Sequence, residues 1–388
     1  MNKHRIVSFP SPPQPWVNPG GGPLEFKQWV PSTDGQGNRY IIQGFEIYAQ
    51  VVATTAGATS LAADLYRFFK AISLQEVDGT MRYNEVSGDA LRMLCYQLLG
   101  AKRTREQFNV AVGAGQSFTV KAYVPLERPQ TEDPYEFCLP VEAFQLLRIR
   151  QPVNSDFNLG AATVAITSIN FQVTARCFVE PKDDLTAYAR DIVQVNDFAN
   201  AATTNQQINV GPNAKVHDCI MYLPGPGGGS AINTAQITQA NIVGIYSQSQ
   251  NLFPDLVDRY ALDHDEEPGL FATTNQSPIH TNPFVPDPAD GAGVNAATNP
   301  RAVALLSSTG NRPDEGPTVN QLTFQLTETA APGVSPRIIT RSVVPQSQGM
   351  VRAQQYANGR GKKQALVKRR DGRSVSPSHQ QYYAKALR

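Results

Sequence analysis

Apolar and polar side chains alternate with a period of two along several segments, which is typical of strands that bury one face. The clearest segment is 169–179, where every odd position is apolar and most even positions are polar. The same alternation runs over 45–51 and over 118–124, where Pro125 ends it. Because these segments lack βαβ spacing, the pattern predicts an all-β fold of antiparallel sandwiches. Further strands are predicted at 73–77, 144–149, 163–166, 302–306, 322–326 and 338–344.

Short helices and a tight turn interrupt the strands of the first half. Leu61, Leu65, Phe68 and Ile72 have helical spacing. Asp78-Gly79 is a hairpin-turn signal after the strand at 73–77. Ser87-Gly88-Asp89 can cap an amphipathic helix, which would continue through Leu91, Leu94, Cys95 and Leu98 and end at Gly100.

Residues 1–35 are predicted to form an extended arm without regular structure. The segment contains seven prolines and the run Gly20-Gly21-Gly22. It also contains Trp16 and Trp29, the only two tryptophans of the chain. Since a disordered tail rarely carries tryptophan, we expect the arm to dock on a neighbouring subunit or on its own body.

The length of 388 residues suits two hydrophobic cores. We expect a first β-sandwich at 36–180, a linker at 181–210 and a second β-sandwich at 211–348. The linker is predicted to hold a short helix at 181–192 and a polar stretch at 199–209. The second sandwich repeats the first loosely at an offset of 165, which places Ile242-Val243-Gly244 on the turn at Val77-Asp78-Gly79. On the same offset, Pro254-Asp255-Leu256 would open a helix through Tyr260, and residues 268–300 are expected to form a long exposed loop.

Charge is distributed unevenly along the chain. Charged residues make up only 17%, which suits a protein that covers much of its surface with copies of itself. Residues 350–388 hold ten Lys or Arg and one acid, which leaves 24 basic and 32 acidic residues for positions 1–349. The body therefore carries about −8 and the tail about +9, and the segment 349–388 is predicted to meet an anionic partner.

The cysteines and the apolar runs indicate where the chain is made. Cys95, Cys138, Cys177 and Cys219 lie far apart, and most sit in apolar segments, so we expect buried, reduced thiols. The first fifteen residues lack the apolar stretch of a signal peptide. No run of about 18 apolar residues is present to span a membrane.

Motifs for catalysis or metal binding are weak. A bicupin-type metalloenzyme needs His-x-His on a strand, but His4, His217, His264, His280 and His379 are not paired in this way. His217 is interpreted as a strand-edge residue. The acidic run 263–267 could hold Ca²⁺, although a solvated loop is favoured. The glycine-rich segment 225–229 lacks the Lys-Ser/Thr of a phosphate loop and is interpreted as a hairpin tip. We therefore predict no catalytic, cofactor or metal site, and no enzyme activity.

The first half resembles a known family at several motifs. They are Ala63-Asp64-Leu65, Ile72-Ser73-Leu74, Asp78-Gly79, Ser87-Gly88 with Leu91, and Tyr123-Val124-Pro125-Leu126. With the repeated sandwich over roughly 40–345, they are similar to the double jelly-roll major capsid proteins of tailless icosahedral viruses with an internal membrane, such as tectiviruses and corticoviruses, with adenovirus hexon as a larger relative. The resemblance implies two tandem jelly rolls and a homotrimer whose six jelly rolls form a pseudo-hexagonal block.

The functional hypothesis that follows is a major capsid protein, made in the host cytoplasm and located in the virion. Its expected partners are itself, neighbouring capsomers, and minor capsid and penton proteins, with no small-molecule substrate. A minor capsid, penton or glycan-binding β-sandwich protein is the alternative, and a bicupin-type enzyme is a more distant one. The basic tail is predicted to touch the internal membrane or the genome, or only to aid solubility, and its candidate contact residues are Arg360, Lys362, Lys363, Lys368, Arg369, Arg370 and Arg373.

Overall fold

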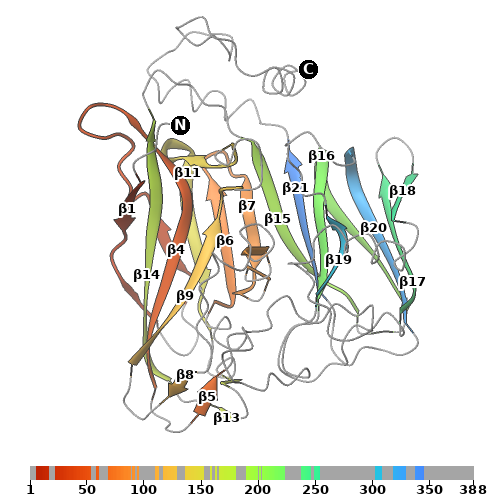
Figure 1. Ribbon diagram of the computed structural model, residues 1–388, viewed down its shortest axis with the longest axis horizontal. Coiled ribbons are helices and arrows are strands. Elements are labelled where there is room, and N and C mark those ends of the chain that lie inside the picture. The colour runs from red at the N-terminus through yellow and green to blue at the C-terminus, as the bar shows by residue number, and fades with distance from the viewer. Residues whose placement is uncertain are drawn as a thin grey trace, which may run out of the picture.

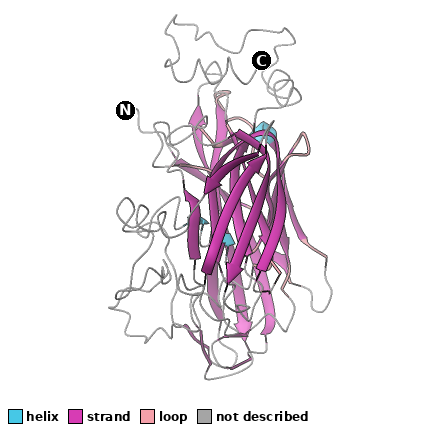
Figure 2. Cartoon of the chain, turned by 90° about the vertical axis from the view of Figure 1, so that its right-hand side faces the viewer, coloured by secondary structure: helices cyan, strands magenta, loops and turns pink. Residues whose placement is uncertain are grey.

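The structure is a computed structural model. It describes residues 6–16, 22–53, 58–60, 69–88, 90–91, 94–95, 110–112, 117–128, 136–152, 158–159, 162–163, 166–180, 189–199, 201, 203–222, 237–245, 249–253, 302–307, 318–328 and 337–344. These residues form a β-protein in two halves that lie side by side (Figure 1). The long strands have roughly aligned axes (Figure 2). Among the described residues, no helix is long and apolar enough to cross a membrane.

The outer sheet of the first half is built on two long central strands. β4 (Arg39–Ala53) and β14 (Ile166–Glu180) pair antiparallel along almost their whole length. The other edge of β14 pairs with β1 (Ile6–Pro10) and β2 (Gln14–Pro15). The other edge of β4 pairs with β9 (Ser117–Pro125) and β10 (Leu139–Pro140). The predicted strands at 45–51, 118–124 and 169–179 are confirmed, and Pro125 ends β9 as expected.

The inner sheet of the first half contains β3 (Leu24–Lys27), β11 (Phe144–Arg150), β6 (Ala71–Glu76) and β7 (Met81–Val86) in that order. β6 and β7 form the predicted hairpin, with Gly79 at a φ of 88° that suits glycine. The inward residues of the two sheets share one hydrophobic core, as the alternation requires. Members of this core include Phe45, Ile47, Leu74, Leu147, Phe171 and Val173, all of them fully buried.

The second half depends on one bent strand that belongs to two sheet segments. β16 (Thr203–Tyr222) pairs first with β20 (Thr318–Glu328) and then with β21 (Arg337–Val344) and β19 (Ala302–Ser307). The register shifts between Asn209 and Ala214, where Gly211 and Asn213 have positive φ. β17 (Ile237–Ile245) and β18 (Ser249–Phe253) extend the sheet beyond β20. The predicted strands at 302–306, 322–326 and 338–344 are confirmed.

Among the described strands, one pairing joins the two halves. β15 (Arg190–Asp197) pairs antiparallel with β21 of the second half and parallel with β7 of the first half. The parallel contact spans two residue pairs, Val193 with Tyr83 and Gln194 with Asn84. It is the one parallel pairing among the described strands, and the sequence pattern did not predict it. The result is a single sheet of eleven strands that runs through both halves (Figure 1).

The N-terminal arm docks on its own body. Trp16 is buried, and its Nε1 donates a hydrogen bond to the Pro152 carbonyl at 2.8 Å. The Nε1 of Trp29 donates to the Phe9 carbonyl at 2.8 Å, and its ring packs against Phe144 with centroids 5.5 Å apart. Docking is therefore confirmed. The expectation of no regular structure was wrong, because β1, β2 and β3 pair at sheet edges, where proline is tolerated: Pro10 ends β1 and Pro15 ends β2.

Three further expectations need correction. Ile72 lies in β6, where it pairs with Ile149 of β11 and Val86 of β7, so it does not continue the helical spacing from Leu61. Residues 190–197 and 203–210, expected to form a linker, are strands with buried apolar positions such as Val193 and Ile208. The segment Ile242-Val243-Gly244 lies inside β17, so the proposed offset does not align it with the turn at Asp78.

Other expectations have a mixed outcome. The helix after Ser87 is confirmed at Gly88, Ala90, Leu91, Leu94 and Cys95, of which the last four are buried. The strand predicted at 163–166 is split between the end of β13 and the start of β14. Residues 61–68, 254–301 and 345–388 lie outside the described residues, as do the predictions made for them. Remaining short elements are β5 (Ala58–Ser60), β8 (Val110–Val112), β12 (Asn158–Leu159), β13 (Ala162–Thr163) and a 3-10 turn at Val141–Ala143.

Candidate functional site

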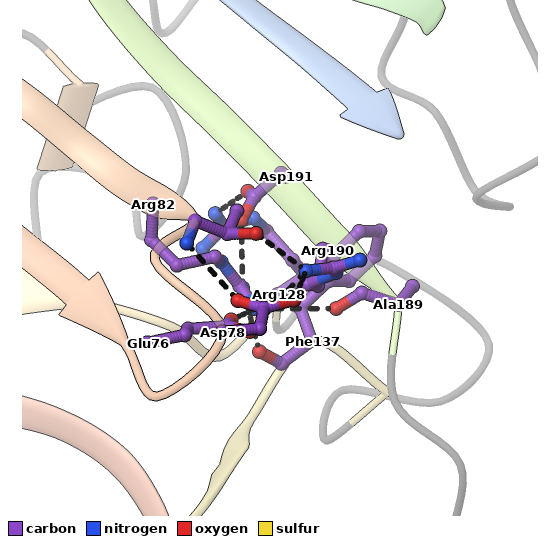
Figure 3. Close-up of polar contacts among 9 residues, drawn as sticks. Glu76, Asp78, Arg82, Arg128, Phe137, Ala189, Arg190 and Asp191 are labelled. Atoms are coloured by element: carbon purple, nitrogen blue, oxygen red, sulfur yellow. Dashed lines mark hydrogen bonds and ion pairs between the residues drawn. The ribbon is translucent and has the colours of Figure 1, made fainter. Parts of the chain in front are cut away.

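A group of charged side chains fills the junction where the two halves meet (Figure 3). The first half supplies charges from β6, the following turn, β7 and the segment after β9, and the second half supplies them from β15 and β21. All of them are buried or nearly so, which is rare for charged residues unless they are paired. We call this group the junction cluster; its members are Glu76, Asp78, Arg82, Arg128, Arg190, Asp191 and Arg341.

Arg82 bridges the two halves. Its Nη1 lies 3.1 Å from Oε1 of Glu76 in the first half, and its Nη2 lies 2.9 Å from Oδ1 of Asp191 in the second half. The same guanidinium donates to the carbonyl oxygens of Phe137 at 3.0 Å and Ala189 at 3.4 Å. The planar guanidinium thus contacts both halves at once, which its rigid array of donors allows.

Both carboxylate oxygens of Asp191 pair with arginine side chains. Arg82 pairs with Oδ1, Arg128 pairs with Oδ2, and Nη1 of Arg341 lies 3.9 Å from Oδ2. Burial alone would raise the pKa of Asp191, but the charges of Arg128, Arg82 and Arg341 outweigh burial and hold this pKa well below its ordinary value. Asp191 is therefore ionised in the folded protein.

Arg128 is held on several sides. Its Nη1 donates to the Glu127 carbonyl at 2.8 Å, and the guanidinium lies 5.5 Å from the centre of the Phe137 ring. Burial would lower the pKa of Arg128, but the charge of Asp191 outweighs that effect and raises the pKa. The contact with the ring adds a cation–π attraction in a site shielded from water.

A second set of contacts ties the start of β15 to the β6–β7 turn. Nη1 of Arg190 lies 2.9 Å from Oδ2 of Asp78 and 2.8 Å from the hydroxyl of Thr80. It also lies 3.6 Å from Oε2 of Glu76. Burial raises the pKa of Glu76, and Arg82 and Arg190 only partly offset this effect.

The geometry of the junction cluster suits a structural role. Glu76, Arg82 and Asp191 are each 0% exposed, so their charged groups cannot reach a substrate in solution. Their contacts are directional ion pairs and hydrogen bonds that cross from one half to the other. Among the described residues, no group of three or more His, Cys, Asp or Glu could hold a metal ion.

The residues singled out from the sequence lie elsewhere. All four cysteines are free and buried, as predicted. His217 is fully buried within β16, so its interpretation as a strand-edge residue was wrong. The acidic run 263–267, the glycine-rich segment 225–229 and the seven basic residues of the tail lie outside the described residues.

The junction cluster itself was missed at the sequence level. A charged residue within a strand is the sequence feature that could have indicated the cluster. Arg82 in β7 is one example, and Asp191, directly before the apolar Ile192 and Val193 of β15, is another. Such a residue is expected to face solvent unless a partner of opposite charge is known to meet it. Arg82 and Asp191 lie 109 residues apart in the chain, so their pairing could not be inferred locally.

Comparison with known proteins relates the whole fold to capsid proteins of viruses. The structure resembles the STIV MCP, from Sulfolobus turreted icosahedral virus, with a TM-score of 0.50 and 13% identity, over 88% of this chain and 97% of that chain. Other similar structures are the major capsid protein of bacteriophage PM2, with a TM-score of 0.40, 11% identity and coverage of 89% and 99%, and that of mavirus, with 0.39, 12%, 88% and 87%. No protein-family model matches the sequence, and no curated protein matches it significantly.

The likeness to the first of these proteins extends through both halves and confirms the predicted fold class. The chain is an all-β protein with two tandem jelly rolls, the architecture of the double jelly-roll major capsid proteins.

Proposed function

We propose that this chain is a major capsid protein that forms homotrimeric, pseudo-hexameric capsomers of an icosahedral virus shell. The observation that carries the proposal is the double jelly-roll fold, shared with the STIV major capsid protein over almost the full length of both chains. Three such chains present six similar sandwiches, and six sandwiches around a threefold axis give a nearly hexagonal outline. A hexagonal outline lets one kind of subunit tile a flat facet.

The junction between the halves supports this role. A capsomer must keep its shape when it contacts neighbouring capsomers. In this chain, one continuous sheet and the junction cluster connect the two sandwiches, which would hold that shape. The low proportion of charged residues, 17%, suits a surface that is largely covered by copies of the chain. The protein would then reside in the virion, with penton and minor capsid proteins as further partners.

The oligomeric state in solution tests the proposal directly. Light scattering of the purified protein is expected to give a mass of ~127 kDa, three times the chain mass of 42.3 kDa. The trimer should persist on dilution, because capsid subunits bury large interfaces. A stable species with the mass of one chain would contradict a capsomer role.

The basic tail is proposed to tether the shell to the internal membrane. Its seven clustered cations lie within positions 360–373, and each basic residue near an anionic bilayer contributes on the order of 1 kcal/mol. Three tails on one trimer would act together and raise the apparent affinity.

Deletion of residues 359–388 is expected to leave the trimer intact and to weaken its binding to vesicles that contain phosphatidylserine. The binding of the full chain should fall as salt is added, because the attraction is electrostatic. A variant with the seven Lys and Arg changed to Gln is the matched control for tail length and should behave like the deletion. Unchanged vesicle binding in either variant, or stronger salt-sensitive binding to nucleic acid than to vesicles, would refute the membrane tether.

A further inference from the structure

The two sandwiches meet through a narrow backbone contact. Among the described residues, two residue pairs of β7 and β15 connect the sheet of the first half to that of the second. So short a ladder leaves the angle between two sandwiches poorly determined, since strands twist readily about one another. The side chains around the ladder must therefore determine how the halves are oriented.

The junction cluster has the properties that this task requires. Arg82 reaches Glu76 through Nη1, and Asp191 and the Phe137 carbonyl through Nη2. Rotation or sliding of β15 against β7 would pull Asp191 away from Arg82 and Arg128, its partners in the first half, and leave it with only Arg341 at 3.9 Å. Burying an unpaired charge is costly, so other orientations are strongly disfavoured.

Stability is a weaker explanation for these charges. Desolvation of both ions largely cancels the attraction within a buried ion pair, and well-packed apolar side chains of similar volume often stabilise a protein equally well or better. An apolar junction would, however, accept many relative positions of the halves, because hydrophobic contact is not directional. A junction of ion pairs and an apolar junction therefore differ mainly in how precisely they fix the relative position of the two halves.

We propose that the junction cluster sets a single orientation between the two jelly rolls, with Arg82 and Asp191 as the positioning residues, and adds little net stability. The orientation itself is independent of the proposed function. Its consequence for assembly rests on the capsid role, because six sandwiches form a hexagonal outline only if every pair has the same angle.

The test replaces the cluster by apolar or neutral side chains of similar size, with Glu76→Gln, Arg82→Met, Arg128→Met, Asp191→Leu and Arg341→Met combined. Arg190 keeps Asp78 as its partner in this variant. The melting temperature is expected to equal or exceed that of the wild type. Spin labels at Gln50→Cys on β4 and Asn205→Cys on β16, both exposed in the native chain, report the distance between the halves. The single narrow distance peak of the wild type should be lost in the variant.

A second variant tests the same idea with a smaller change. Arg82→Lys keeps the charge but cannot contact Glu76, Asp191 and Phe137 together, so the distance peak should broaden while the protein stays folded. Asp197→Asn with Arg337→Gln removes an exposed ion pair between β15 and β21 and is the matched control, for which the peak should stay narrow.

The outcomes separate the possibilities. A narrow wild-type peak in both cluster variants would overturn the proposal, and so would failure of the fivefold variant to fold, since the cluster would then be needed for stability. Loss of the narrow peak with normal trimers would support the orientation and count against its role in assembly. A narrow wild-type peak in a protein that never forms trimers would refute the capsid role alone.

Discussion

Asp191→Asn is expected to lower the free energy of unfolding by about 3–5 kcal/mol, the largest effect of any single substitution at the junction. The neutral side chain keeps the volume but leaves Arg82 and Arg128 buried without their shared counter-charge. Chemical denaturation followed by circular dichroism measures the change. The control is Asp197→Asn on the same strand, whose side chain is 63% exposed and pairs with Arg337. That change should cost about 1 kcal/mol or less. Equal losses in the two variants would refute the importance of burial here.

Asp191 also makes the free energy of unfolding depend on pH. The folded-state pKa of Asp191 lies below its unfolded value, so its contribution to stability is complete above the unfolded pKa of about 4 and is lost as pH falls through the folded pKa. Glu76 acts in the opposite sense, because its pKa is raised and its protonation stabilises the folded state. The wild type should therefore lose more stability than Asp191→Asn when pH is lowered from 5 to about 2. Parallel curves for the two proteins would contradict the assignment of a low pKa to Asp191.

Trp16→Ala is expected to cost about 3–5 kcal/mol, since it removes a large buried side chain and leaves a cavity. It also removes the donor to the Pro152 carbonyl, and with it a link between the arm and the segment after β11. Denaturant unfolding measures the loss, and the fluorescence of the remaining Trp29 reports whether the arm stays docked.

Ser8→Ala is the control for the arm. Ser8 lies on β1 with an exposed side chain, so its replacement should change stability by less than about 0.5 kcal/mol. If Trp16→Ala lowers the free energy of unfolding no more than Ser8→Ala does, the docked arm contributes little to the stability of the fold.

Much of the fold follows from local pattern. The strands β4, β9 and β14 were predicted because each buries one face, and a half-buried strand must alternate. The helix after Ser87 was predicted from its cap and its apolar spacing. The β6–β7 turn was predicted because Asp-Gly suits its backbone. In all these cases, the residues that decide the structure are neighbours in the sequence.

The features that were missed depend on distant partners. β15 has a half-buried pattern, but its polar ends and the small residues that follow it were interpreted as a linker. Its parallel partner β7 lies more than a hundred residues earlier, and no local rule pairs the two strands. The strands of the arm were missed for a similar reason, because Leu24 and Phe26 become a strand only when the edge of β11 is available to them.

The order of strands in the large sheet has a consequence for synthesis on the ribosome. The described strands of the first sandwich lie within residues 6–180, so it can complete their pairing while the rest of the chain is still being made. In the second sandwich, β21 lies between β15 and β16, although it is the last described strand to be translated. The second sandwich cannot complete its sheet until β21 has been translated. Until then, the edges of β15 and β16 that pair with β21 are unpaired and open to misfolding and to binding by chaperones.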